Sequence, residues 1–547
     1  MSIIHSSLLL GAGAAAGGYQ IERSLRFNSS DSAYLSKAFG SPTSSVAWTW
    51  ASWVKKTLIT TSTDYRGIFE CGAGSNYAYL DFSDNSIRYV NRPTTGTIAV
   101  LQTTPVYRDA SAWFHMVFAY DSANGTSTDR LRLYVNGTRV TIFSSSTYPD
   151  PSQASVFNSA VDHRIGRDAG NNGYFDGYLA DIHFIDGQAL TPSSFTEVSA
   201  TTGQLIPKAY TGTFTGNSFW LKFSDNSSTT SGSNVGIGKD FSGLGNYWNS
   251  TNLSVTAGAG NDSLVDTPTS YGTGNSGGDV RGNFCTWNPL QSSAATLTNG
   301  NLDCTTAVAT GAQTRGTIAV STGKWYWEIL VNTTVSANNI GIIKTSEALA
   351  ADRPSYYAGG YCYVGSSGNK ENNASASSYG ATYGSGDVIG VALDLDAGTL
   401  VFYKNGTSQG TAFSSLSGEF IPAIGDGTGG SGMDISANFG QRPFAHPAPS
   451  GFKALCDTNL ISTTITTSGS YTGNGVADGP FVYLNGVPTA MTIGGNAVTF
   501  GTHADKLSNG FKIRTSSTTY NQNASSYSYS ITSTGAAFKN ARAQPNP

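Results

Sequence analysis

Residues 131–140 read LRLYVNGTRV, and residues 399–407 read TLVFYKNGT. In both stretches a run of strand-forming residues ends in an Asn-Gly pair, and residues 481–486, FVYLNG, repeat the pattern. An Asn-Gly pair readily adopts the two positive φ angles of a type I′ turn, whose twist suits paired antiparallel strands. The three stretches therefore predict three β-hairpins, one in each of three β-domains in series.

The composition favours the same fold class. At 547 residues the chain is too long for a single hydrophobic core. Its 65 glycines supply turns, and no long stretch has apolar residues at the i, i+3, i+4 and i+7 spacing of an amphipathic helix. We predict an all-β protein built of serial β-sandwiches, with a small β-domain at the C-terminal end.

Charge and cysteine usage narrow the function. Charged residues make up 12% of the chain and the formal net charge is −4, so no basic surface attracts nucleic acid or anionic lipid. No segment is long enough to span a membrane. The five cysteines lack C-x₂-C spacing and are expected to be reduced core residues, with a Cys285–Cys304 pair left open.

The chain divides into five parts. Residues 7–18 are apolar, but the run is short, interrupted by glycine and not preceded by Lys or Arg, which argues against a signal peptide. We interpret this segment as part of an assembly arm. The predicted parts are an N-terminal arm at 1–22, a first sandwich at 23–200, a Gly/Asn-rich bridging segment at 201–282, a second sandwich at 283–450 and a C-terminal β-domain at 451–547.

The first sandwich carries a recognisable order of strands. SLRF begins at 24, WFHMV at 113, YVNG at 134 and FDGYLADIHF at 175. This order resembles the laminin-G-like, concanavalin A-type jelly roll. A helical turn is expected to follow at 191–195, where Pro192 stands just inside its start.

The second sandwich carries a stronger set of motifs. GKWYWEI begins at 323, GDVIGVALD at 386, FYKNG at 402 and NFGQRPF at 438. All four resemble segments of the SPRY domain, another bent β-sandwich, and they occur in the order found in that family.

Catalytic patterns are missing from the sequence. Glucanases with the jelly-roll fold place paired carboxylates on one strand, and none of the seven glutamates has that spacing. There is no HExxH motif and no G-x-S-x-G elbow with a recognisable histidine partner. His115 and His183 are expected to be structural, and we predict that the chain is not an enzyme.

Calcium is the one cofactor that the resemblance suggests, because many jelly rolls of this kind bind Ca²⁺ through loop oxygens. The candidate ligands are Asp121, Asp168, Asn171 and Asp176. Ca²⁺ needs six to eight converging oxygens, and a turn-capping role is the alternative for each residue.

A binding surface is predicted in the second sandwich. Tyrosines and a polar loop at 366–378 could stack on and hydrogen-bond a sugar, since binding residues favour loops held by a rigid scaffold. The candidate ligand-binding residues are Tyr356, Tyr357, Asn369, Lys370, Asn372, Asn373 and Tyr379.

The whole arrangement resembles virion surface and tail proteins of tailed bacteriophages, especially marine ones. The resemblance implies a tail-fibre, spike or appendage adhesin that binds host-surface glycans. It would attach to other virion proteins through its arm, form a homotrimer, and be located on the virion, extracellular after host lysis. The alternatives are a decoration or tail-knob protein whose sandwiches bind other virion proteins, and a secreted lectin.

Overall fold

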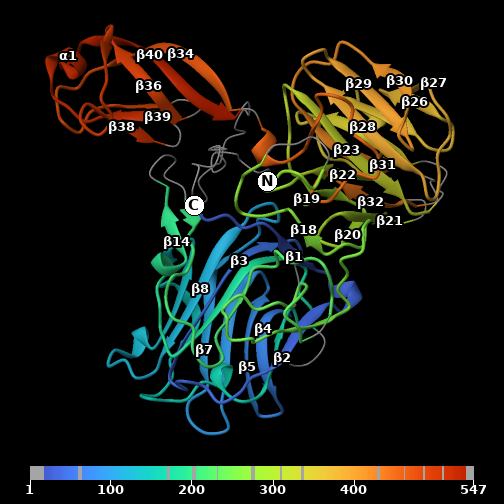
Figure 1. Cartoon of the computed structure of the whole chain (residues 1–547). Coiled ribbons are helices and arrows are strands. Elements are labelled where there is room, and N and C mark those ends of the chain that lie inside the picture. The colour runs from blue at the N-terminus through green and yellow to red at the C-terminus, as the bar shows by residue number, and fades with distance from the viewer. Residues whose placement is uncertain are drawn as a thin grey trace.

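The computed structural model describes residues 18–536, apart from 60–64, 169–172, 200–204, 231, 273–276, 308–310, 334–337, 428–431, 461, 484–486 and 508–509. Strands dominate these residues and form three β units in chain order (Figure 1). The one α-helix in the described part is α1 (Thr518–Asn521). Six 3-10 turns accompany it: η2 (Ser29–Asp31), η3 (Ser127–Asp129), η4 (Val156–Asn158), η5 (Pro192–Ser194), η6 (Pro354–Tyr356) and η7 (Asp457–Asn459). The prediction of an all-β fold is confirmed, as is the turn at Pro192.

Two antiparallel sheets build the first unit. The first sheet contains, in spatial order, β10 (Thr138–Arg139), β9 (Leu131–Val135), β8 (Phe114–Asp121), β3 (Ala47–Lys56), β13 (Gly177–Asp186), β1 (Ser24–Phe27) and β18 (Ser263–Leu264), with β16 (Phe219–Leu221) also on β13. The second contains β11 (Phe143–Thr147), β7 (Ala99–Val106), β6 (Ser86–Arg92), β5 (Asn76–Ser83), β4 (Tyr65–Ala73), β12 (Asp162–Ile165), β2 (Tyr34–Ala38) and β17 (Asn249–Thr251).

Alternation along β3 explains the core of this unit. Trp48 and Trp50 face the space between the two sheets, whereas Ala51 and Trp53 face outward. The outward face is also covered, because Phe195 and other residues after β13 pack on it. The covering segment includes the two-stranded sheet of β14 (Thr196–Val198) and β15 (Leu205–Pro207).

The predicted bridging segment, 201–282, supplies strands to the first sandwich. β16 pairs with β13, β17 pairs with β2, and β18 pairs with β1. Trp248 is fully buried in the first core, which accounts for the large aromatic residues in this Gly-rich stretch.

Two further sheets build the second unit. One contains β19 (Trp287–Ser293), β22 (Ala312–Gly316), β31 (Phe420–Asp426), β24 (Asn339–Lys344), β25 (Gly360–Val364), β26 (Asn369–Asn372) and β27 (Ser375–Ser378). The other contains β20 (Ala295–Thr298), β21 (Asp303–Thr306), β32 (Asp434–Asn438), β23 (Lys324–Val331), β28 (Val388–Asp394), β29 (Thr399–Lys404) and β30 (Thr407–Phe413), with β33 (Lys453–Ala454) on β23.

The Asn-Gly turns of these two units adopt the predicted geometry. Asn136 and Gly137 have φ of 47° and 77°, and Asn405 and Gly406 have 49° and 78°. Each asparagine also pairs with the neighbouring strand. The Oδ1 atom of Asn136 accepts from the His115 N–H at 2.9 Å, and that of Asn405 accepts from the Val388 N–H at 2.8 Å.

The third unit has two small sheets around Ile493, Phe511 and Ile531. One contains β34 (Ser462–Thr472), β40 (Ser526–Ala536), β36 (Val487–Ile493) and β37 (Asn496–Ala497), and the other β35 (Phe481–Tyr483), β39 (Gly510–Ile513) and β38 (Ala504–Leu507). The predicted turn at 485–486 lies outside the described residues. Its flanking strands, β35 and β36, belong to different sheets, so the expected simple hairpin is not formed.

A buried polar interface joins the first two units. Lys55 Nζ lies 2.8 Å from Asp266 Oδ2, and both side chains are fully buried. Beside this interface, Arg26 on β1 forms a buried pair within the first unit, with Asp262 just before β18, at 3.0 Å. Tyr178, from β13, packs in the second core, and its hydroxyl donates to the Gly300 carbonyl at 2.8 Å.

The five cysteines are all buried and free. The disulfide between Cys285 and Cys304, which the sequence left undecided, is therefore not formed. No helix among the described residues is long and apolar enough to cross a membrane. Most of the predicted arm lies outside the described residues. Its last part, around Tyr19 and Ile21, packs against the first unit.

Candidate functional site

The connection from β24 to β25 crosses the outer face of its sheet, and side chains of that sheet hold it in place. Arg315, on β22, donates to the carbonyls of Glu347 and Ala348, each at 2.8 Å. Further along, the Ser355 hydroxyl donates to Asn339 Oδ1 at 2.6 Å. Tyr357 packs against apolar residues of the sheet, including Ile343. The connection is therefore a rigid platform for the side chains that point away from it.

Tyr356 is the side chain that this platform exposes. It is 49% exposed, and the Arg353 guanidinium lies over its ring at 5.7 Å from the centroid. Arg353 is held by Glu371 on β26, with Nη2 2.8 Å from Oε1. The hydrogen bond to Glu371 raises the pKa of Arg353 above its ordinary value, so this residue stays charged.

The turn between β26 and β27 completes the site. Asn373 and Ala374 have φ of 51° and 56°, and their N–H groups donate to the carbonyls of Tyr357 and Ser355 at 3.3 and 3.0 Å. The Asn372 side chain donates to the carbonyls of Ala358 and Gly360 at 2.9 and 2.7 Å. We call Arg353, Tyr356 and Asn373, together with the buried Glu371 that holds Arg353, the Tyr356 surface.

Of the seven predicted binding residues, the structure brings Tyr356, Tyr357, Asn372 and Asn373 together. Lys370 and Tyr379 instead fasten one sheet to the other. Lys370 Nζ donates to the Ala412 carbonyl at 2.6 Å, and the Tyr379 hydroxyl donates to the Gly410 carbonyl at 2.6 Å. Lys370 faces away from Glu371 because successive strand residues point to opposite sides. Asn369 begins β26, and its N–H donates to the Ser367 hydroxyl at 3.2 Å.

Sequence reasoning missed the ion pair at this site. Arg353 and Glu371 are 18 positions apart. The two residues have opposite charges and stand on either side of residues 354–369, which contain the tyrosines and no charged residue. This charge pattern was the sequence signal that could have predicted the ion pair.

The predicted calcium ligands do not converge. Asp121 is paired with Ala47 at one end of β3, and Asp176 lies beside its other end, next to Gly177, which pairs with Lys56. A ten-residue strand places these ends on the order of 30 Å apart. Asp176 lies 3.3 Å from Arg66 Nη1.

Asp168 is the third candidate that the structure describes. Asp168 accepts from the Gly173 N–H at 3.1 Å, and Asn171 lies outside the described residues. Across the described part of the chain, no group of three or more His, Cys, Asp or Glu residues could hold a metal ion.

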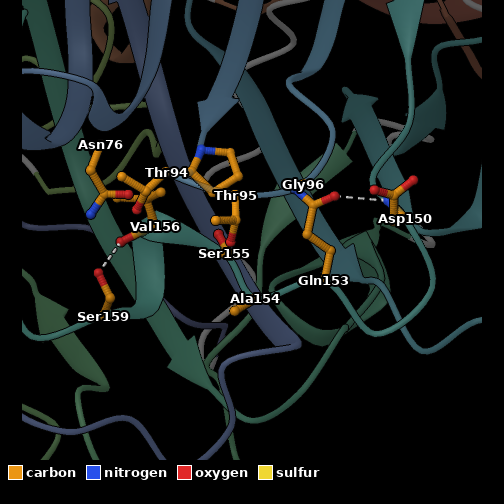
Figure 2. A pocket seen from close by; sticks show the side chains of 11 residues that line it. Asn76, Thr94, Thr95, Gly96, Asp150, Gln153, Ala154, Ser155, Val156 and Ser159 are labelled. Atoms are coloured by element: carbon orange, nitrogen blue, oxygen red, sulfur yellow. Dashed lines mark hydrogen bonds between the residues drawn. The ribbon is translucent and has the colours of Figure 1, made fainter.

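A polar hollow of about 440 Å³ opens at the rim of the first sandwich (Figure 2). Two of its lining residues bond to each other, the Asp150 N–H donating to Gln153 Oε1 at 2.9 Å, and Gln153 Nε2 also donates to the carbonyl of neighbouring Thr97 at 2.7 Å. Nothing in the sequence singled out this hollow. It is lined by Asn76, Pro93, Thr94, Thr95, Gly96, Asp150, Gln153, Ala154, Ser155, Val156 and Ser159.

Two buried titratable residues, His115 and Glu328, have structural surroundings. Burial lowers the pKa of His115 to about 3, and the ring packs beside Trp53. Glu328 is buried, and its two carboxylate oxygens accept from the N–H groups of Ala445 and His446 at 2.7 and 2.9 Å.

Comparisons with known proteins assign the first two units. The model of the concanavalin A-like lectin/glucanases superfamily matches residues 27–194, and the SPRY domain model matches residues 324–442. Among solved structures, the SPRY domain of human HERC1 is similar, with 18% identity over 28% of this chain and 96% of that chain and a TM-score of 0.25.

Curated relatives match over a stretch of SPRY length. The Ran-binding proteins 9/10 homolog of Drosophila melanogaster is 33% identical over 138 residues, which is 25% of this chain and 14% of that protein. Ran-binding protein 9 of Homo sapiens is 33% identical over 129 residues, 23% of this chain and 17% of that protein. The chain thus spans less than a fifth of the length of either relative.

These relatives correct the functional prediction. They are animal Ran-binding proteins, which contradicts the phage tail adhesin and its decoration-protein and lectin alternatives. The predicted virion partners, host glycans, homotrimer and virion location are withdrawn with it. The resemblance to phage proteins rested on domain order, and domain order does not determine function. The domain assignments themselves are confirmed: the chain contains a concanavalin A-like domain followed by a SPRY domain.

Proposed function

We propose that the chain is a non-catalytic binding protein whose SPRY domain recognises a segment of a partner protein at the Tyr356 surface. The observation that carries the proposal is a half-exposed tyrosine held against a charged arginine on a pinned platform. Tyrosine and arginine are the side chains that most often dominate protein–protein binding energy.

Rigidity supports this role. Arg315 fixes the platform from below, and the β26–β27 turn fixes it from the side, so little conformational freedom is lost on binding. Arg353 offers hydrogen-bond donors and the exposed Asn373 amide offers a donor and an acceptor, which suits the mixed polar groups of a peptide backbone. The relatives are named for binding Ran, and we therefore place Ran among the protein ligands to be tested.

A peptide-library selection on the full chain, with direct titration of purified Ran, tests the proposal. Tyr356→Ala should weaken the selected ligand about 30-fold, the effect of losing a hot-spot side chain. Tyr65→Ala is a matched control, because Tyr65 is 40% exposed and lies under Arg88 at 4.3 Å, but on the first sandwich. Binding that survives Tyr356→Ala, or that falls equally in Tyr65→Ala, contradicts the proposal.

A further inference from the structure

The third unit has a long free strand edge. β34 has eleven residues and lies at the end of its sheet, where it pairs with β40 alone. The pairing runs from Ser462 opposite Ala536 to Thr472 opposite Ser526 without a register shift. The other side of β34 therefore presents backbone groups that no strand of the described chain uses.

The hydrogen-bond pattern identifies those groups. The Gly473 N–H donates to the Ser525 carbonyl at 2.8 Å, which continues the ladder with β40. Because an antiparallel ladder alternates, Tyr471 and Gly469 also bond to β40, while Ser470 and Ser468 direct their N–H and C=O groups outward. The central strand agrees: Ser528, opposite Ser470, accepts from Gly494 of the other neighbour at 2.8 Å.

This edge lacks the protection that strand edges normally carry. Charged residues, proline and bulges keep edges from pairing with other chains, and residues 462–472 contain none of them. The edge strand β30 shows the contrast. Its Gly410 and Ala412 carbonyls accept from Tyr379 and Lys370, and its pairing with β29 has two register shifts.

We propose that β34 pairs antiparallel with β34 of a second copy of this chain, which joins two C-terminal units into one continuous sheet. A twofold axis between residues 466 and 468 would place Ser470 opposite residue 464 of the other copy, and Ser468 opposite residue 466. Every outward-facing residue then meets another outward-facing residue, so the strand is complementary to itself. Ser468, Ser470 and Thr472 are small and exposed, and a neutral strand does not repel its own copy.

Sedimentation of the full chain over a range of concentrations tests this pairing. The wild-type chain should form a dimer. Ser470→Pro removes an N–H that the monomer does not use, so it should weaken the dimer roughly tenfold or more and leave the melting of the third unit nearly unchanged. Ser470→Ala keeps that N–H and should dimerise normally.

A charge pair of variants locates the interface. Ser468→Lys should weaken the dimer, because the twofold axis places the two added cations only two residues, roughly 7 Å, apart along the paired strands. Ser530→Lys is the matched control: it adds the same charge to the same exposed face, one strand further in. A wild-type chain that stays monomeric overturns the proposal. A dimer that Ser470→Pro leaves intact, or that both lysine variants weaken equally, overturns it as well.

Discussion

Replacing Lys55 with methionine should destabilise the joint between the first two domains by about 3–5 kcal/mol, the usual cost of leaving one member of a buried ion pair alone. The Lys55 ammonium donates to Asp266 at 2.8 Å, to Asn283 Oδ1 at 2.7 Å and to the Phe284 carbonyl at 3.3 Å. All three of its N–H bonds are therefore satisfied. Without it, Asp266 keeps only the Trp113 indole N–H among its side-chain donors, at 2.9 Å.

The destabilisation should depend on pH. Burial raises the pKa of Asp266, and Lys55 opposes that rise. In Lys55→Met the folded-state pKa therefore rises further above the unfolded value, and the native state binds the extra proton. Stability of the variant then falls as the pH rises between the two pKa values, so the cost should be smaller at pH 5 than at pH 8. Adding Asp266→Asn should recover part of the loss and flatten this dependence.

Calorimetry of the full chain provides the assay, because separate transitions can be assigned to separate units. Lys324→Met is the matched control: Lys324 lies 2.8 Å from Asp394, but its side chain is 41% exposed. An exposed pair contributes little, so this variant should melt close to wild type. If Lys55→Met melts no earlier than Lys324→Met, the joint does not depend on the buried pair and the argument fails.

Three further predictions concern a turn asparagine, a buried histidine and the cysteine thiols. Asn405→Gly keeps a residue that tolerates positive φ but loses the acceptor for Val388, so it should cost about 1 kcal/mol, whereas Asn405→Val should cost more; thermal melting that ranks them in reverse contradicts this. The pKa of His115 is lowered, so the native first domain binds fewer protons than the unfolded chain and loses stability as the pH falls below about 6.5. His115→Phe should reduce that acid limb in melting curves between pH 4 and 7, while the buried His163 and His183, whose pKa values are also lowered, keep the rest of it. The thiols are all buried, so a thiol reagent should label the native chain slowly and the unfolded chain at all five cysteines; rapid native labelling would refute the burial.

Local chemistry made much of the fold predictable. The turns at Asn136 and Asn405 follow from the residues themselves, because few other residue pairs accept two positive φ angles. Strand pairing in the third unit could not be predicted from the sequence. β35 and β36 are consecutive along the chain, but they pair with strands of two different sheets. That choice depends on which distant strands bury Ile531 and Phe511, and no local pattern encodes it.

The site was predictable only in part, for a geometric reason. Tyr356 and Asn373 were both expected as ligand-binding residues and do lie together, because the β26–β27 turn closes onto the platform. Lys370 was grouped with them, but its side depends on the register of β26 with β25, which the sequence does not reveal. The distance between Asp121 and Asp176 also depends on strand pairing, because the pairing places each residue at a different end of β3.

The joint at Lys55 bears on the binding role proposed for the Tyr356 surface. If the two domains were joined only by a flexible linker, the SPRY domain could bind a partner in any orientation relative to the first domain. Tyr178 instead buries its ring in the SPRY core, and Asn301 reaches back to the Thr57 carbonyl at 3.0 Å. The concanavalin A-like domain therefore holds the Tyr356 surface in one orientation, and a partner that contacts both domains loses no interdomain freedom on binding. Loosening the joint with Lys55→Met should then weaken such a partner even though Tyr356 is untouched, whereas a ligand confined to the Tyr356 surface should bind as before.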